Sequence, residues 1–485
     1  MDQFLQERPW VEDFSPIIVL LIVIAFVIAR LPRVELGHSA AFRARRVTNW
    51  LPVGFLYAFL YMGRYNLTVA KGVLGESLSV QDFSWVFAAG TITYGSAFII
   101  NGPLTDRIGG KKAILIGAAG AAVANALMGL VIYDAMETGV GAYFVYALTG
   151  LYMMNMYFQS FGAVAIVKIN APWFHVRERG VFGAIFGILI SLGIFFAFDV
   201  GGMIMDGEGG SVPLGFFVPA FLLLVFACIV AVRVAESPGK AGFDDFDTAD
   251  ASSGDDGEQL GAKEVFELML SQPVILTIAA IEFCSGFLRQ SIMNYYRIFA
   301  KAVTPADPEA NPELVNFKAE WVYEHWGTVL CCAGILGGTF AGIISDKLFQ
   351  SRRGPVAAIL YGIMLVGAIA LTFLYVDPMI GWIVAFMSMS VIGVHGMLSG
   401  TASMDFGGKK NVGVAVGIID GFVYAGTGVM ALLYMVILPT EGEADYADID
   451  AWQIWPISMI PVAAIGLLFA TRVWNAKPKP KNAAK

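Results

Sequence analysis

The sequence predicts an all-α polytopic membrane protein: two six-helix bundles, which make 12 core helices, plus one extra N-terminal transmembrane helix. Of its 485 residues, 57% are hydrophobic and only 14% are charged, whereas soluble domains average about 25% charged. Apolar runs recur along the whole chain, and one charged motif appears in both halves. These runs are continuous over about 20 residues without alternation, which argues against a β-barrel.

Thirteen segments are apolar enough to cross a bilayer. They cover residues 15–31, 49–69, 83–104, 112–133, 140–167, 180–203, 212–232, 273–296, 321–344, 355–376, 379–402, 411–438 and 452–472. The first follows an acidic stretch in which Arg8 is the only basic residue. Because a secretory signal begins with basic residues, we expect this first span to be retained as an extra helix.

The distribution of Lys and Arg predicts the orientation. Loops that share one side of the membrane, together with the C-terminal tail, hold 24 of the 31 basic residues, and the opposite side holds 5. Basic loops stay in the cytoplasm. We therefore expect a multi-pass protein of the cell (inner) membrane, surrounded by lipid, with its N-terminus outside and its C-terminus in the cytoplasm.

The spans and their connections predict six regions. These are an extracytoplasmic N-terminus (1–14), the extra helix with a basic loop (15–48), an N-terminal bundle (49–232), an acidic flexible cytoplasmic linker (233–272), a C-terminal bundle (273–472) and a basic cytoplasmic tail (473–485). The linker carries several Asp residues among Gly and Ser, a composition typical of flexible chain.

A short motif occurs once in each half. Residues 102–112 contain Gly-x-x-x-Asp106-Arg107 followed by Lys111, and residues 342–354 contain Gly-x-x-x-Asp346-Lys347 followed by two arginines. The two copies are six helices apart, as in transporters built from repeated bundles. Each Asp lies at a cytoplasmic helix end, where it can accept from a basic side chain or a helix N-terminus. We expect such contacts to close the cytoplasmic side.

The motif resembles that of the major facilitator superfamily, and the chain after the first span is similar to the organophosphate:phosphate antiporter branch. The residues that carry the resemblance are Gly102–Lys112, Tyr61-Met-Gly-Arg64-Tyr-Asn66, Glu178-Arg179-Gly180, Phe287-Leu-Arg289, Ser345-Asp346-Lys347 and Lys409-Lys410. The resemblance implies gating roles for the charged motif residues, Arg179 among them, and a phosphate grip by the two arginines inside the membrane.

Arg64 and Arg289 are the main candidate site residues. They lie 15 and 16 residues from the starts of the first helix in each bundle, hence about 22–24 Å from the cytoplasmic edge. A buried charge costs at least about 2.5–3.5 kcal/mol, and guanidinium forks match phosphate oxygens. The pattern predicts an anion site between the bundles. The alternative is a structural salt bridge to Glu282, seven residues before Arg289.

Polar stripes on several helices extend the predicted site. Helical spacing places Tyr57, Tyr61, Arg64 and Thr68 on one stripe. The full set of expected substrate-binding residues is Arg64, Arg289, Tyr57, Tyr61, Tyr157, Gln159, Glu282, His395 and Asp420. Three of these (Glu282, His395 and Asp420) are titratable, so one of them could carry a proton.

Together these features predict a secondary active transporter of an organic anion. The expected substrate is a phosphorylated metabolite, moved by alternating access in exchange for inorganic phosphate. Three positions depart from the branch's pattern (Phe98, Ile190 and Cys331) and keep a less polar anion open. Proton-coupled transport of a carboxylate and a non-transporting sensor are the alternatives.

Several classes of protein are not expected. No catalytic constellation appears, so an enzyme is not predicted, and neither a metal nor an organic cofactor is implied. The net charge of −8, without a basic block, argues against nucleic acid as a partner. We expect a monomer.

Overall fold

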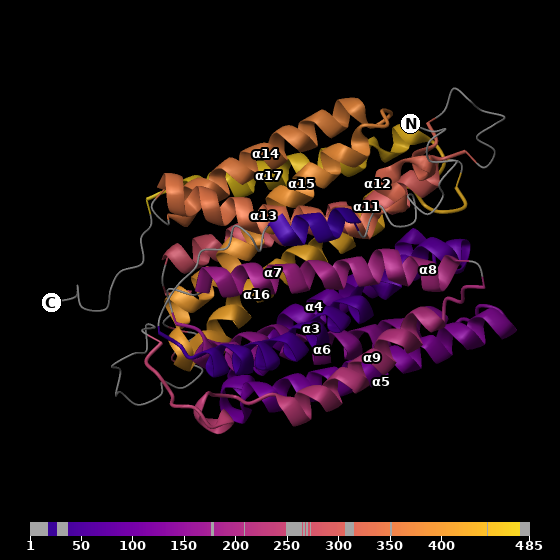
Figure 1. The fold of residues 1–485 in the computed structure, drawn as a ribbon. Helices are drawn as coiled ribbons and strands as arrows, with labels where there is room; N and C mark the ends of the chain where they lie inside the picture. Colours follow the sequence, from indigo (N-terminus) through magenta and orange to yellow (C-terminus); the bar gives the residue numbers. More distant parts are fainter. Residues whose placement is uncertain are drawn as a thin grey trace.

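The computed structural model describes residues 18–26, 37–175, 179–207, 209–248, 264, 267, 270–271, 273–305, 315–349, 352–443 and 445–475. Within these ranges, residues 179–186, 346–347, 400–413 and 415 are described by their backbone alone. The described chain is helical, with long helices lying side by side in two groups (Figure 1). This confirms the predicted all-α class.

The first bundle is built from the first half of the chain. Its elements are α3 (Ala40–Leu74), α4 (Val80–Ile108), α5 (Gly110–Thr138), α6 (Phe144–Asn170), α7 (Arg179–Phe195) with the π-helix η4 (Phe196–Val200) and α8 (Gly201–Asp206), and α9 (Leu214–Arg233). Short 3-10 turns, η1 (Gly75–Ser77) and η2 (Ala171–Trp173), follow α3 and α6.

The second bundle repeats this plan. Its elements are α11 (Pro273–Val303), α12 (Trp321–Glu324), α13 (Trp326–Phe349), α14 (Arg353–Leu374), α15 (Ile380–His395) with the π-helix η7 (Gly396–Ala402), α16 (Ser403–Ile437) and α17 (Ile454–Arg472). The short turns η5 (Gly239–Ala241), η6 (Phe317–Ala319) and η8 (Ile449–Gln453) lie in connections.

Ten described helices are long and apolar enough to cross a membrane. The helices α3 and α6 are not among those ten, although both are longer than 25 residues. They carry polar side chains inside the bundle, which lowers their hydropathy. With these two helices, the described chain supplies the twelve predicted core spans.

Helix α3 begins nine residues before its predicted span, at Ala40 rather than residue 49. Ser39 caps it by accepting from the backbone N–H of Phe42 at 3.1 Å, an N-cap that stabilises the first turn. The leading turns hold basic residues: Arg46 donates to the carbonyl of Trp173 at 3.3 Å. Hydropathy detects only the lipid-embedded part of this helix.

The two bundles meet along two seams. Helix α4 packs against α16 on one side, and α7 packs against α13 on the other (Figure 1). The helical segment 18–26 belongs to the predicted extra helix and lies at the second seam. Its Leu20 packs with Phe195 of α7 and with Cys331 and Ile335 of α13. The remainder of that predicted span lies outside the described residues.

The molecule has two chemically distinct ends. We call the end where α4 stops at Ile108 and α6 stops at Asn170 the basic end. The opposite end, where α3 stops at Leu74 and α11 stops at Val303, is the acidic end. The short elements α8 and α12 lie at the acidic end, on the right of Figure 1. Arg64 and Arg289 lie between these ends, in α3 and α11.

Candidate anion-binding site

Arg64 is held in a cage of neutral groups. It is 1% exposed, and its Nε donates to Oε1 of Gln159 at 2.9 Å. Its Nη1 and Nη2 donate to the hydroxyls of Tyr424 at 2.7 Å and Tyr94 at 2.8 Å. The rings of Tyr61 and Tyr94 lie 4.5 and 4.4 Å from the guanidinium carbon. Among the described side chains, no carboxylate pairs with this buried cation.

A chain of amides positions the Gln159 side chain. Its Nε2 donates to Oδ1 of Asn155 at 3.0 Å, and Asn125 donates to the same oxygen at 3.1 Å. Asn66 in turn donates to Oδ1 of Asn125 at 2.7 Å. This network links α3, α5 and α6. It therefore leaves Oε1 of Gln159 free to accept from Arg64.

Arg289 is even less satisfied by the protein. It is 5% exposed, and its Nε and Nη2 are buried without a hydrogen-bond partner among the described atoms. Its guanidinium carbon lies 5.9 Å from the centroid of the Tyr424 ring. Buried N–H groups without acceptors cost free energy. A buried guanidinium with unpaired N–H groups is suited to bind an anion, because it can donate hydrogen bonds to the anion's oxygens.

Tyr424 brings the two arginines together. Its hydroxyl accepts from Arg64 of the first bundle, while its ring faces Arg289 of its own bundle. The ring also packs on Tyr94, with centroids 4.2 Å apart. Two cations in repeat-related helices thus lie at one aromatic junction. This is the arrangement expected for a dianion held between the bundles.

Acidic groups lie beside Arg289 without forming an ion pair with it. Glu282 is fully buried and its Oε2 contacts Nδ1 of His395 at 2.9 Å. Its other oxygen has no partner among the described atoms. Ser399 donates to Oδ1 of Asp420. Within the described chain, the structural alternative of an Arg289–Glu282 salt bridge is not formed.

Most of the predicted site residues lie together. Tyr57 packs edge-to-face on Tyr61, with centroids 5.2 Å apart, and Tyr61 lies over Arg64. Tyr157 lies apart from this group, because its ring packs against Phe158 and Phe161. Tyr157 is two residues from Gln159, and residues at that spacing point to different helix faces.

Tyr94 and Tyr424 are partners of Arg64 that the sequence did not predict. Tyr94 lies in a largely apolar helix, so no polar stripe marked it. Tyr424 lies four residues after Asp420, on the same helix face, but it is not among the predicted site residues. Each contact crosses between helices, and helix rotation decides it. The one feature of the sequence that could have indicated these contacts is the phenol hydroxyl, since a tyrosine in a membrane helix needs a hydrogen-bond partner.

The first copy of the repeated motif forms contacts within one bundle. Asp106 accepts from Lys168 of α6 at 2.7 Å, and Arg107 is exposed. The N-terminus of α5 meets Glu236, whose Oε1 accepts from the backbone N–H of Lys111 at 3.4 Å.

Glu236 is suited to this capping role by its charge. Burial alone would raise its pKa, but the hydrogen bond and charge of Lys240 outweigh burial, so the pKa lies below its ordinary value. The ionised carboxylate can then stabilise the positive end of the α5 dipole.

The second copy cannot be compared in the same detail. The backbone of Asp346 and Lys347 lies in α13, and that of Arg179 begins α7, but their side chains lie outside the described part of the structure. The gating roles of all these residues stay predictions.

Polar contacts join the bundles in the half of the molecule near the acidic end. Thr68 donates to Oδ1 of Asn294 at 3.2 Å, and Gln290 donates to the hydroxyl of Tyr65 at 2.9 Å. Ser84 with Tyr295 at 2.7 Å and Lys71 with Glu441 at 2.6 Å also join the bundles. They separate the arginine pair from the acidic end.

A helix cap adds to this closure. One carboxylate oxygen of Asp199, in η4, accepts from the backbone N–H of Gly327 at 2.7 Å. The other accepts from the N–H and hydroxyl of Thr328 at 2.7 and 2.6 Å. These donors belong to the first turn of α13. Thus an acid of the first bundle caps a helix of the second bundle, a charge-assisted contact that favours the closed arrangement.

The described His, Cys, Asp and Glu side chains include no group of three that could hold a metal ion. The cluster around Arg289 has only carboxylates, one imidazole and a hydroxyl in pairs. The chemistry that this region can perform is electrostatic binding of an anion.

Known proteins are similar to this chain over most of its length. Similar proteins include the glycerol-3-phosphate transporter of Bacillus subtilis, 25% identical over 454 residues that cover 90% of this chain and 94% of the relative. The membrane sensor protein UhpC of Escherichia coli is 24% identical over 401 residues, covering 78% and 82%. A probable hexose phosphate transport protein of Chlamydia pneumoniae is 22% identical over 445 residues, covering 87% and 90%.

These relatives confirm the resemblance predicted from the sequence. A bacterial homolog of the lysosomal transporter Spinster, in an inward-facing and unoccupied conformation, superposes with a TM-score of 0.63 at 13% identity, covering 90% of this chain and 98% of that one. The family model of the Major Facilitator Superfamily matches residues 53–432. The chain therefore belongs to the Major Facilitator Superfamily.

Proposed function

We propose that this protein is a secondary active transporter that moves a phosphorylated organic anion by alternating access, in exchange for inorganic phosphate. The observation that carries the proposal is the pair Arg64 and Arg289. Each is almost fully buried, one lies in each bundle, and neither pairs with a described carboxylate.

The charge of the pair matches a phosphate monoester. Two guanidinium groups carry two positive charges, and a phosphate monoester carries about −1.5 to −2 at pH 7. Planar forks donate two parallel N–H groups to two oxygens. Binding across the bundles would let the same anion contact both halves as they rock around it. The named substrates of two relatives, glycerol 3-phosphate and hexose phosphate, are of this class.

The proposed placement follows the distribution of charge. The basic end would lie in the cytoplasm and the acidic end outside, in an inner membrane as expected for relatives from bacteria. The contacts at the acidic end would then close the outer side.

Exchange into proteoliposomes preloaded with phosphate tests the proposal. Arg64→Lys and Arg289→Lys should each abolish uptake of labelled phosphate, because lysine retains the charge but loses the fork. Arg472→Lys is the matched control, since Arg472 lies at the end of α17 and stacks on Phe469. Full exchange in both site variants would refute the proposal.

The buried Glu282–His395 contact favours a second candidate, proton-coupled uptake of the anion. A carboxylate with zero exposure that meets an imidazole can share a proton with it. A pH gradient, without internal phosphate, should then drive uptake. Glu282→Gln should abolish uptake driven by the pH gradient and leave phosphate exchange intact.

Tight phosphate binding without any flux would instead indicate a sensor, the described role of one relative.

A further inference from the structure

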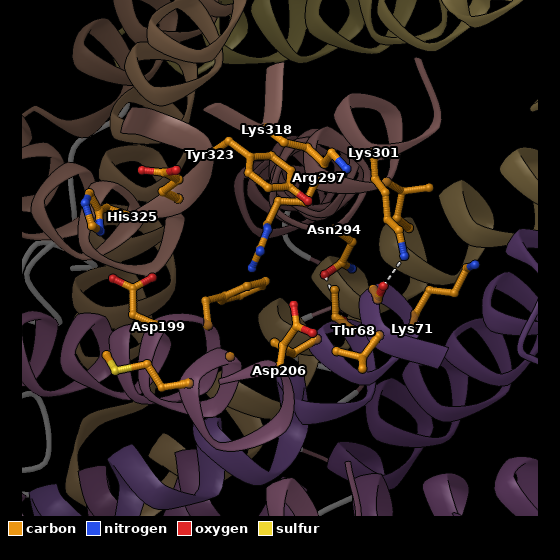
Figure 2. Close-up of a pocket in the computed structure, with 18 of the residues that line it drawn as sticks. Thr68, Lys71, Asp199, Asp206, Asn294, Arg297, Lys301, Lys318, Tyr323 and His325 are labelled. Carbon is orange, nitrogen blue, oxygen red and sulfur yellow. Dashed lines mark hydrogen bonds between the residues drawn. The ribbon is translucent and has the colours of Figure 1, made fainter. Parts of the chain in front are cut away.

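A polar space lies between the bundles at the acidic end. It is a pocket of about 780 Å³ that lies beyond the Thr68–Asn294 contact from the arginine pair. Figure 2 shows it enclosed by side chains from both bundles. Its charged lining residues are Lys71, Arg297, Lys301, Lys318, Asp199, Asp206, Glu324 and Glu441.

Two of the four carboxylates in this pocket have clear partners, Asp206 makes no hydrogen bond or ion pair within the described residues, and three of the four cations form no ion pair there. Asp199 accepts the N-terminal N–H groups of α13, and Glu441 pairs with Lys71. Within the described chain, no carboxylate pairs with Arg297, Lys301 or Lys318, although Lys301 donates to the carbonyl of Gly72. These three cations therefore keep N–H donors available to a solute, in a lining that holds as many carboxylates as cations.

Among these three cations, Arg297 has the N–H donors that are best placed to meet a solute. Its guanidinium points into the middle of the pocket (Figure 2). Its carbon lies 4.7 Å from the centroid of the Tyr323 ring, a stacking that holds one face of the fork and leaves its edge free to donate. The fork is thus oriented before any anion arrives.

The pocket also lies on the axis that leads to the central site. Arg297 follows Arg289 by eight residues on α11, which places it about 12 Å farther toward the acidic end. Three cross-bundle contacts of α11 lie between the two arginines: Thr68 with Asn294, Tyr65 with Gln290, and Ser84 with Tyr295. An anion that leaves the first site would reach the second once these contacts open.

We propose that this pocket is a second anion site, in which Arg297, helped by Lys318 and Lys301, holds a phosphate group before it passes to Arg289. The inference rests on the proposed function, because it takes the same class of solute. It predicts two phosphate sites in one chain, one at the arginine pair and one at the acidic end. The site at the acidic end binds more weakly, since it is more open to water.

Calorimetric titration of the purified full chain with inorganic phosphate tests this directly. The unchanged protein should bind two phosphates, and Arg297→Gln should bind one. In an Arg64→Gln/Arg289→Gln background, one site should remain, and adding Arg297→Gln should weaken it at least tenfold. Arg472→Gln is the control and should alter neither site. An unchanged stoichiometry in Arg297→Gln would overturn the inference.

These outcomes separate the two proposals. If the central substitutions change nothing but Arg297→Gln removes phosphate binding, the proposed function fails and the second site stands. If the central pair is required but Arg297→Gln has no effect, only this inference fails.

Transport kinetics give an independent measurement in a chain whose central site is intact. Arg297→Gln should raise KM for phosphate severalfold with kcat unchanged, because it weakens capture and not translocation. Arg297→Lys should restore part of the loss at low salt, where a point charge still steers the anion. A lowered kcat with an unchanged KM would indicate a merely structural role and would overturn the capture site.

Discussion

At the scale of single residues, Tyr424 competes with the proposed substrate for Arg64. Its hydroxyl accepts from Nη1 at 2.7 Å and is buried. Tyr424→Phe should leave that N–H without an acceptor and lower the thermal stability, since such a group costs about 1–3 kcal/mol. The same change frees one donor for phosphate, so phosphate affinity should rise severalfold. Calorimetry and thermal unfolding would measure both effects.

A surface tyrosine supplies the control for this experiment. Tyr375 donates to Oδ1 of Asp450 at 2.5 Å in an exposed connection, so Tyr375→Phe removes a hydroxyl far from the arginines. Its phosphate affinity should equal that of the unchanged protein. Weaker phosphate binding by Tyr424→Phe would show that the hydroxyl helps to bind the anion and does not compete with it.

The residues of this site differ in how well the sequence predicts them. Arg64 and Arg289 were identifiable because a charge inside an apolar run is costly, so their presence alone marks a function. Tyr94 and Gln290 were not identifiable, because their partners lie on other helices and depend on rotation and tilt. Tyr157 was predicted in the site for its residue type, but its ring packs against Phe158 and Phe161 on another face of the helix.

At the scale of elements, the contact between η4 and α13 should control closure of the acidic end. Asp199→Ala removes three hydrogen bonds that cross between the bundles. The population open at this end should therefore increase. Spin labels on exposed positions 76 and 376, in a variant without the four native cysteines, should report longer distances by double electron–electron resonance.

Asp206 provides the matched comparison for this prediction. It lines the same pocket but is exposed, and it makes no hydrogen bond or ion pair within the described residues. Asp206→Ala should leave the distance distribution unchanged. If both variants open the acidic end equally, the loss of negative charge rather than the loss of the helix cap is the cause.

The turn between α4 and α5 gives a second prediction at this scale. Gly109 has a φ of 91°, and a Cβ there would lie 2.2 Å from Oε1 of Glu236. Gly139 has the same φ with nothing within 4 Å. Gly109→Ala should therefore lower the melting temperature more than Gly139→Ala, which carries only the backbone cost of about 1–2 kcal/mol. In a Glu236→Ala background the difference in melting temperature between the two glycine variants should become smaller. An unchanged difference would show that backbone strain, and not the contact with Glu236, causes it.

The elements themselves were largely predictable. All twelve core spans appear because lipid requires long apolar helices with internally satisfied backbone. The boundaries were less predictable. Helix α3 extends to Ala40 because Ser39 caps it and basic side chains contact neighbouring loops, and neither effect contributes to hydropathy. The π-helix η4 was not expected, although it places Asp199 at the start of α13.

At the scale of the whole molecule, alternating access requires the two bundles to separate at the acidic end. Thr68 and Asn294 lie in different bundles with side-chain oxygens 3.2 Å apart. Cysteines at both positions, bridged by oxidation or by a short reducible bifunctional reagent, should hold this end closed. Phosphate exchange should stop and should return when the bridge is reduced.

A bridge inside one bundle distinguishes locking from damage. Asn101 and Ser160 lie 2.7 Å apart in α4 and α6 of the same bundle, so the pair Asn101→Cys/Ser160→Cys can be bridged in the same way. Because rigid bundles move as units, exchange should continue through this bridge. Continued exchange through the oxidised Thr68→Cys/Asn294→Cys pair would mean that the acidic end need not open, and rocking of the bundles around the arginine pair would be refuted.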